Sequence, residues 1–371
     1  MRLLAINARA NAASLPGGDS IQMEKTCQAL QALGVTIEAR QPADLDRMPV
    51  CDLAHVYNIQ EPETTWQVFE SLTRRGIPFV LSSIYWDMYE YWAEEALHKL
   101  KSWKRLASIY GMERARKLYL RWQYLKAPGK QPWRLKRKLL QTARRVLPNS
   151  HSEVAHLQKS FWLGDDFREK VDVVPNAIDT SLYLQRPRPS QAFLEQYNLR
   201  DFVLEVGTIY PVKNQLGLLE ALEDVPVPVV FIGQVMEARS EYALACKELA
   251  RQRGNVLFLD WVDHTQLKNI YALAAVHALP SWRETPGLVS LEAAAAGCNV
   301  VTTSIGSTYD YFGDLAYYCH PADRMSIRDA VVSALENRPN GKLRERVLAE
   351  FTWQRAAQAT LDSYTKALNS S

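Results

Sequence analysis

Cysteine is scarce in this chain of 371 residues, and its placement excludes several classes of protein. The five cysteines, Cys27, Cys51, Cys246, Cys298 and Cys319, are odd in number and widely separated, and no two stand in CxxC spacing. This pattern argues against a disulfide framework and against a zinc ribbon, and it favours a reducing cytoplasm. The seven histidines include no HExxH pair and no Cys/His ligand spacing, so we expect no zinc site.

Long apolar runs are missing as well. The N-terminal apolar run is too short for a secretory signal, and no stretch approaches the ~20 apolar residues of a membrane span. We therefore expect neither export by such a signal nor an integral membrane protein. The composition, 47% hydrophobic and 23% charged, is that of an ordinary globular protein, and at ~150 residues per domain the length predicts two domains.

Short β-branched or apolar runs alternate with amphipathic stretches of helical length, which is the pattern of βα units in parallel sheets. The expected strands are 2–7, 35–39, 52–57, 78–83, 144–148 and 171–175, then 202–207, 227–233, 255–260, 276–280, 299–303 and 315–319. The rhythm predicts two doubly wound α/β domains that face each other across a cleft. We place the domains at 1–178 and 179–352, with a C-terminal helix over 353–371 that packs across the domain junction.

Charge is distributed unevenly. The net charge is only +3, yet residues 99–145 contain sixteen Lys or Arg and one acid, Glu113, interleaved with Trp and Tyr. This segment falls in an expected helical insert over 88–143. Three interpretations compete: a nucleic-acid face, a solvated helical surface, and a helix pair at an anionic membrane surface. We favour the membrane, and we expect no nucleic acid because no motif for it is present.

The most informative stretch is residues 277–303, HALPSWRETPGLVSLEAAAAGCNVVTT. A strand is expected to end at Pro280, and a helix to begin near Gly287, whose amide, with those of Leu288 and Val289, would form an anion site. Glu292 lies inside that helix, where a carboxylate can bind the two hydroxyls of a ribose, and Glu284 precedes the helix, where it can reach a second polyol. The alternative is that both are acids favoured by the helix dipole, which explains Glu284 better than Glu292.

At these residues the sequence resembles the retaining glycosyltransferases of family 4, whose two-glutamate signature matches Glu284 through Glu292. Further resemblances occur in the family's order along essentially the whole chain. They are LPGGDSIQMEKTCQALQALGV, RRVLPNSHSEVAHL, VDVVPNAID, VLEVGTIYPVKNQLGLLEAL and the closing FTWQRAA.

The resemblance implies a GT-B fold in which the C-terminal domain holds a nucleotide-sugar without a metal ion. Lys213 then neutralises the diphosphate, Glu292 binds ribose, and Glu284 with the helix amides holds the sugar and phosphates. Main-chain groups near Val262 and Leu267 would read uracil, which makes UDP the implied nucleotide. The implied donor-binding set is Gly17, Gly18, Thr208, Lys213, Asn214, Val262, Leu267, Arg283, Gly287, Leu288, Val289 and Glu292, and the implied catalytic set is Glu284, Lys213 and Asp87.

Two departures from the family pattern concern its polar contacts. Thr208 stands where the family has an arginine, and Arg283 is either its substitute or a solvated loop cation. The family's His-Asp pair reads Trp86-Asp87, so Asp87 is either the remaining contact to the acceptor or a helix N-cap.

Together these patterns predict retaining transfer of a hexose, with glucose favoured, from a UDP-sugar to a hydroxyl of a polysaccharide or lipid-linked oligosaccharide. The enzyme is expected in the cytoplasm, attached peripherally to the inner face of the membrane. The alternative is a nucleotide-sugar-binding protein of the same fold that does not turn over.

Overall fold

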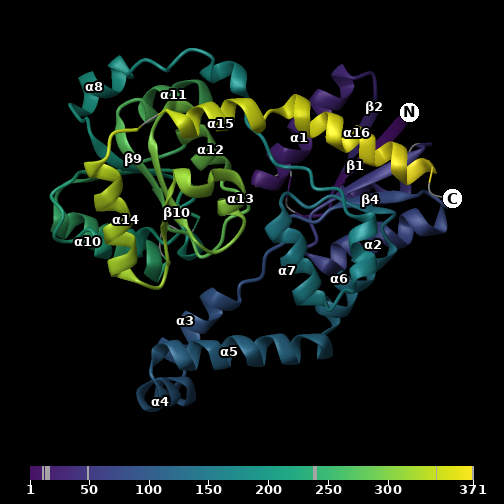
Figure 1. Ribbon diagram of the computed structural model, residues 1–371, viewed down its shortest axis with the longest axis horizontal. Coiled ribbons are helices and arrows are strands. Elements are labelled where there is room, and N and C mark those ends of the chain that lie inside the picture. Colours follow the sequence, from purple (N-terminus) through teal and green to yellow (C-terminus); the bar gives the residue numbers. More distant parts are fainter. Residues whose placement is uncertain (11, 13–16, 48–49, 237–239, 340, 370–371) are drawn as a thin grey trace. The chain divides into compact units, whose positions relative to one another are not determined.

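The chain divides into two compact units, Met1–Ala177 with Trp353–Ser371, and Ile178–Thr352 (Figure 1). The computed structural model describes all residues except 11, 13–16, 48–49, 237–239, 340 and 370–371, and it leaves out the side chains of 45–47 and 264.

The first unit contains a five-stranded sheet in the order β2-β1-β3-β4-β5, and every pairing is parallel. Its strands are β1 (Arg2–Asn7), β2 (Thr36–Arg40), β3 (Leu53–Tyr57), β4 (Phe79–Ser82) and β5 (Arg145–Val146). Strands β1, β3 and β4 are almost entirely buried, because a parallel sheet carries helices on both faces.

Alternate residues of these strands serve the two faces. Leu4 and Ile6 pack with α2 (Pro62–Arg74), α6 (Gln131–Thr142) and α7 (His151–Phe161). Leu3, one residue along, packs with α1 (Gly18–Ala32) and with the C-terminal helix α16 (Trp353–Asn369). In Figure 1, α16 lies along α1 and thus belongs to the first unit.

The second unit contains a six-stranded parallel sheet in the order β11-β10-β9-β6-β7-β8. Its strands are β6 (Phe202–Val206), β7 (Val229–Ile232), β8 (Val256–Leu259), β9 (Ala274–Leu279), β10 (Asn299–Thr303) and β11 (Tyr317–Cys319). One face packs with α11 (His264–Tyr271), α12 (Leu288–Ala296) and α15 (Lys342–Glu350), and the other with α9 (Gln215–Ala221), α10 (Glu241–Arg253) and α14 (Arg324–Glu336). Two short helices complete the unit, α8 (Gln191–Tyr197) and α13 (Thr308–Phe312).

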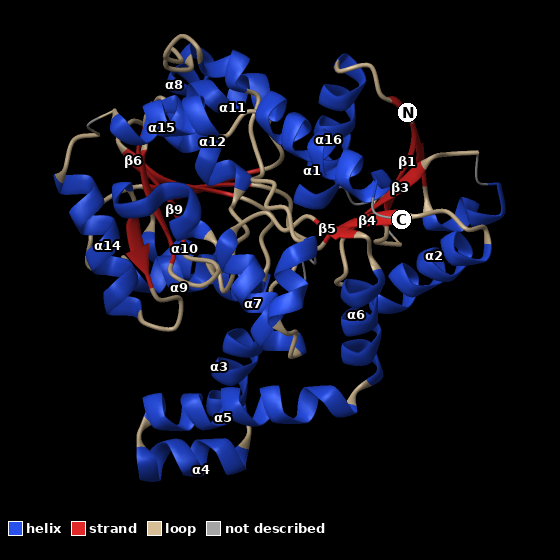
Figure 2. Ribbon diagram, turned by 45° about the vertical axis from the view of Figure 1, so that its right-hand side comes forward, coloured by secondary structure: helices blue, strands red, loops and turns tan. Residues whose placement is uncertain are grey.

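Between β4 and α6 the chain forms three further helices, α3 (Tyr89–Lys99), α4 (Lys101–Tyr110) and α5 (Met112–Lys126). They share a small core of their own, built from Ala93, Ala96, Leu97, Trp103, Ala107, Ala115 and Tyr119. Figure 2 shows α4 and α5 side by side, projecting away from the sheet of the first unit. We call α3, α4 and α5 the helical insert.

The two parallel-sheet α/β units confirm the predicted fold class, and each expected strand except one is present within a few residues. The strand expected over 171–175 is wrong. Only Val171 forms a bridge, to Val146, and Val174 then donates to the carbonyl of Pro148. Proline has no N–H to return a hydrogen bond, so the pairing stops there.

All five cysteines are free thiols. Within the described ranges, none of the helices has both the length and the apolar character needed to cross a bilayer.

Candidate functional site

The sheet of the second unit reverses its strand order between β6 and β9, which are neighbours although three strand connections separate them in sequence. In open parallel sheets, ligands bind beyond the carboxyl ends of the strands at such a switch point. Lys213 follows β6 and Glu284 follows β9, so the two predicted residues lie at this point. Their side chains meet, with Lys213 Nζ 2.6 Å from Glu284 Oε1.

Main-chain bonds fix the position of Glu284. Its N–H donates to the carbonyl of Ile305, and its carbonyl accepts from the N–H of Ser307, which ties the loop after β9 to the loop after β10. Gly306 makes this possible: its φ is +125°, and a Cβ there would lie 2.0 Å from the carbonyl oxygen of Glu284. The side chain of Glu284 is only 8% exposed, so the carboxylate is held rather than solvated.

Helix α12 begins beside this carboxylate. Gly287, with φ +82°, precedes the helix without a side-chain cap, and a Cβ there would lie 3.3 Å from Glu284 Oε2. The intrahelical bonds start at the amides of Ser290 and Leu291, which donate to the carbonyl of Gly287. The amides of Gly287, Leu288 and Val289 therefore precede the hydrogen-bonded ladder, where a helix attracts anions.

Glu292 lies one turn further along α12 and is half-buried. Tyr183 and Tyr271 lie near it: burial raises the pKa of both phenols, and the Glu292 carboxylate raises it further. Tyr271 also donates to the carbonyl of Val289 (3.1 Å), which holds it against the first turn of the helix. Glu292 is the only charged residue of α12, and its contact with a ribose stays a prediction.

The side chain of Asn214, predicted to contact the donor, is hydrogen-bonded within the protein through Nδ2. Its Nδ2 donates to the carbonyls of Pro280 (3.1 Å) and Pro321 (3.0 Å), so both N–H groups of the amide are used within the protein. Asn214 thereby joins the loops after β6, β9 and β11.

The remaining donor-side predictions have mixed outcomes. Thr208 lies in the loop after β6, where its carbonyl accepts from Gln215 Nε2, and Arg283 is half-buried beside Glu284. Val262 is half-buried in the loop after β8. Leu267 requires a correction: it is a core residue of α11, and its amide donates to the carbonyl of Asp263 (2.8 Å), so that amide cannot also read a base.

Sequence reasoning missed Glu205, in the middle of β6. Its side chain is buried, and neither carboxyl oxygen has a hydrogen-bond partner among the described residues. Burial raises the pKa of Glu205 well above its usual value; the positive charge of Lys213 opposes this shift, and the negative charge of Glu284 adds to it. Glu205 is thus a buried carboxyl group whose pKa is influenced by the Lys213–Glu284 pair. A charged residue inside the apolar run FVLEV was the available signal.

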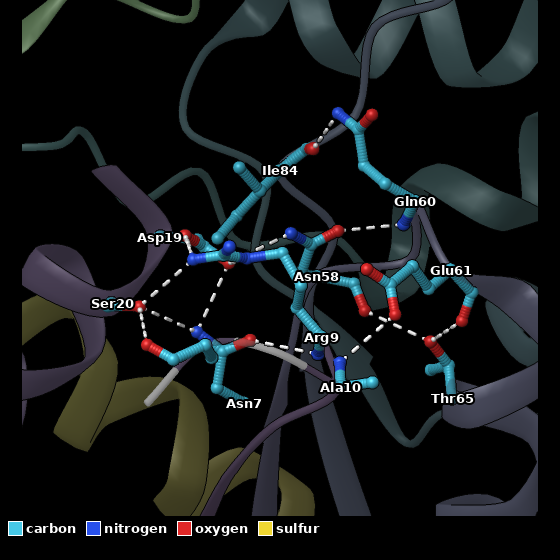
Figure 3. Close-up of polar contacts among 11 residues, drawn as sticks. Asn7, Arg9, Ala10, Asp19, Ser20, Asn58, Gln60, Glu61, Thr65 and Ile84 are labelled. Carbon is cyan, nitrogen blue, oxygen red and sulfur yellow. Dashed lines mark hydrogen bonds and ion pairs between the residues drawn. The ribbon is translucent and has the colours of Figure 1, made fainter. Parts of the chain in front are cut away.

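The switch point of the first unit lies between β1 and β3, and a polar cluster occupies it (Figure 3). Asp19, at the start of α1, accepts hydrogen bonds from Asn7 at the end of β1, from Asn58 after β3, and from Arg9. Arg9 binds both oxygens of Asp19 at 3.0 Å. Burial would raise the pKa of Asp19, but the hydrogen bonds and the charge of Arg9 outweigh it, so the pKa is lowered.

Gly17 and Gly18, predicted at a ligand-binding glycine loop, lie beside this cluster. A Cβ on Gly17 would be 3.1 Å from Asp19 Oδ1 and 3.4 Å from a terminal nitrogen of Arg9. Gly17 thus leaves room for the Arg9–Asp19 pair, and Gly18 begins α1.

Asp87, between β4 and α3, contacts a residue that the sequence did not single out. His156 of α7 places Nε2 at 3.0 Å from Asp87 Oδ2, and its ring stacks on Trp86 at 4.0 Å between centroids. Asp87 also accepts from the amide of Tyr89 and the hydroxyl of Tyr124. Burial would raise the pKa of Asp87, but the contacts with His156 and the other donors outweigh it, so the carboxyl stays ionised. Asp87 and His156 are 69 residues apart, so only the fold reveals the pair.

No group of three or more His, Cys, Asp or Glu side chains suited to a metal ion occurs among the residues that the structure describes.

Residues 190–349 match the family model "Glycosyl transferases group 1". The chain is 29% identical over 212 residues to D-inositol 3-phosphate glycosyltransferase of Mycobacteroides abscessus, covering 54% of this chain and 47% of the relative. It is 27% identical over 206 residues to O-antigen chain mannosyltransferase B of Escherichia coli, covering 50% of this chain and 52% of the relative. The aligned region thus spans about half the length of these curated relatives.

Solved structures share the fold along the whole chain. Sucrose-phosphate synthase from Thermosynechococcus elongatus superposes with a TM-score of 0.76 at 19% identity, covering 100% of both chains. Anabaena Alr3699/HepE, solved in complex with UDP and glucose, gives a TM-score of 0.70 at 16% identity, covering 98% of this chain and 99% of that one. The predicted GT-B fold class is confirmed, and the match to the glycosyl transferases group 1 model lies in the second unit.

Proposed function

We propose that this protein is a metal-independent, retaining glycosyltransferase that moves a hexose, with glucose as the first candidate, from a UDP-sugar to an acceptor hydroxyl. The observation that carries the proposal is the Lys213–Glu284 ion pair facing the uncapped start of α12 at the β6/β9 switch point. A cation and three helix amides converge there, which suits a diphosphate. The complex of HepE with UDP and glucose supports the choice of nucleotide.

Donor binding would exchange the partners of this ion pair. A diphosphate at the start of α12 would attract Lys213 away from Glu284, which frees the carboxylate to accept hydrogen bonds from sugar hydroxyls. In the transfer, the bond from the anomeric carbon to the diphosphate breaks and a bond to the acceptor oxygen forms on the same face. The acceptor proton passes to the departing phosphate, and Lys213 with the helix dipole stabilises the charge that develops on it.

On the acceptor side, we propose that Asp87 orients and His156 binds. The three hydrogen bonds that Asp87 accepts all come from the first unit, which makes it a positioning residue. Trp86 stands where the family has a histidine. The imidazole of His156, which stacks on Trp86, would supply the polar contact to the acceptor in its place. A polysaccharide or lipid-linked oligosaccharide is the proposed acceptor, at the cytoplasmic face of the membrane.

The test is donor-dependent release of UDP from a panel of UDP-sugars, with the anomeric configuration of the product read by NMR. We expect release with UDP-glucose, retention of configuration, and unchanged turnover in EDTA. UDP binding without release would instead support the non-catalytic alternative, and loss of activity on chelation would overturn metal independence.

A further inference from the structure

The helical insert exposes an unusual share of the molecule's large apolar side chains. Eight of the twenty exposed large apolar side chains of the described residues lie within it. They are Trp92, Leu100, Ile109, Tyr110, Met112, Leu118, Trp122 and Leu125. Isolated exposed apolar residues are common, but a concentration of this kind marks an interaction surface.

Three of these side chains form a stripe along α5. Leu118, Trp122 and Leu125 follow each other at helical spacing, and they are 47%, 45% and 64% exposed. Arg114 and Arg121 lie on the same face, one turn on either side of Leu118. The neighbouring face, through Ala115 and Tyr119, packs into the core of the insert. Trp122 lies at the edge of that face, with its ring centroid 5.6 Å from that of Tyr119 and 5.9 Å from that of Trp103, so Leu118 and Leu125 form the outer part of the stripe.

Helix α4, which packs against α5, carries further exposed cations. Lys101, Lys104 and Arg105 are exposed, and Ile109 lies beside them at the end of the helix. Helix α4 contains no acid, and α5 contains only Glu113, which pairs with Lys117 four residues on. The acids of the insert are on α3 instead, where Glu94 binds Arg116 and Glu95 binds Lys99.

The cations of α6, which belong to the same basic segment of the sequence, are engaged within the first unit. Arg134 donates to the carbonyl of Pro128, and Arg137 to that of Phe161. Lys136 lies 5.0 Å from the ring centroid of Tyr85, and Lys138 lies 4.6 Å from that of Trp66. Residues 99–145 are one basic segment in the sequence, whereas in the structure most of their cations divide between the helical insert and α6.

We propose that the outer face of α4 and α5 docks on an anionic lipid bilayer, with the Leu118, Trp122 and Leu125 stripe at headgroup depth and the flanking cations on lipid phosphates. The inference names the surface through which the membrane location proposed above would be reached. Exposed leucines and a tryptophan among cations are the composition of an interfacial helix. A second copy of the chain is disfavoured, because it would bring two faces of like charge together.

The experiment is co-sedimentation of the full chain with vesicles of phosphatidylcholine alone or with phosphatidylglycerol, over a range of salt. We expect binding only with phosphatidylglycerol, and a steep loss with salt because charges are screened within ~8 Å at physiological ionic strength. Substitution of Lys104, Arg105, Arg114 and Arg121 by Gln should lower the partition coefficient by about two to three orders of magnitude. Leu118→Gln with Leu125→Gln should weaken binding to the same vesicles while leaving the charge unchanged.

Two controls separate this proposal from its alternatives. Substitution by Gln of Arg188, Arg200, Lys247 and Arg338, four exposed cations of the second unit, removes the same charge and should leave vesicle binding nearly intact. UDP binding by thermal shift should be unchanged in every variant, so loss of the nucleotide site would be visible separately from loss of lipid binding. Equal binding to neutral and anionic vesicles, or release by the second-unit variant alone, would overturn the proposal.

Discussion

The two sheets place polar residues at equivalent positions, beyond their carboxyl ends at the switch points, but the groups are paired in different ways. In the first unit, Asp19 accepts hydrogen bonds from three side chains, and Arg9 binds it through two nitrogens. In the second unit, Lys213 and Glu284 share one contact, and Lys213 keeps 29% of its side chain exposed. Glu205 lies nearby, and neither of its carboxyl oxygens has a hydrogen-bond partner in the part of the chain that the structure describes.

This difference separates stability from ligand exchange. A carboxylate with several internal donors gains little from a ligand and loses much when a partner is removed. A single ion pair beside an uncapped helix can exchange its partners at small cost, because an incoming anion replaces Glu284 at Lys213. We therefore expect substitutions in the first cluster to change the free energy of unfolding, and substitutions in the second to change binding and turnover.

The largest effect is expected for Lys213→Ala. One charge-assisted contact to a departing anion is worth about 3–4 kcal/mol in comparable sites, so turnover should fall by two or more orders of magnitude. Steady-state release of UDP measures this, with Arg283→Ala as the control. Near-normal activity of Lys213→Ala together with loss in Arg283→Ala would show that Arg283 is the important cation.

Asp19→Ala should come next, with its effect on stability. Breaking a buried pair costs about 3–5 kcal/mol, and since Arg9 keeps partial solvent contact we expect about 2–3 kcal/mol from denaturant unfolding. The pKa of Asp19 is lowered in the folded state, so this stabilisation is present above the usual carboxyl pKa and disappears as pH falls through the lowered value. Glu248→Ala, at an exposed pair, is the control and should change little. An Asp19→Ala protein of unchanged stability but weakened UDP binding would show that the first cluster serves ligand binding and not stability.

The two glutamates of the second unit should separate binding from turnover. Glu292→Ala should weaken UDP itself by about ten- to a hundredfold, because hydrogen bonds to a charged group contribute about 1.5–3 kcal/mol. Glu284→Ala should spare UDP and reduce turnover. Calorimetric titration with UDP distinguishes them, and equal affinity of wild type and Glu292→Ala would contradict the ribose assignment.

The smallest effect is expected for Glu205→Gln, which should stabilise the protein by about 1–2 kcal/mol at neutral pH. The folded pKa of Glu205 is raised, so the folded state holds a proton that the unfolded chain releases, and stability falls as pH rises above the usual carboxyl range. The gain in Tm should therefore grow from pH 4 to pH 7. A constant difference across this range would mean that Glu205 does not hold its proton in the folded protein.

Much of the second unit was predictable from the sequence. Its strands are apolar runs bounded by Gly and Pro, and the spacing from Pro280 through Glu284 to Gly287 places a loop before a helix start. Because strands were expected over 202–207 and 276–280, Lys213 and Glu284 were expected in the loops that follow them. The amide of Leu267 donates within the first turn of α11, whose start is marked by Asp263 as N-cap, so the helix itself was readable from the sequence.

What the sequence determined by itself is local: the alternation of strands and helices, and the loop and helix start that present Glu284. Tertiary structure alone decided which distant groups meet. It brought His156 to Asp87, used the amide of Asn214 to join three loops, and left Glu205 without a hydrogen-bond partner among the described residues. It also placed the α6 cations against carbonyls and rings of the first unit, while Lys104, Arg105, Arg114 and Arg121 of α4 and α5 stay exposed. The physical reason is that hydrophobic periodicity fixes the face a residue occupies, whereas its polar partners depend on which elements pack against that face.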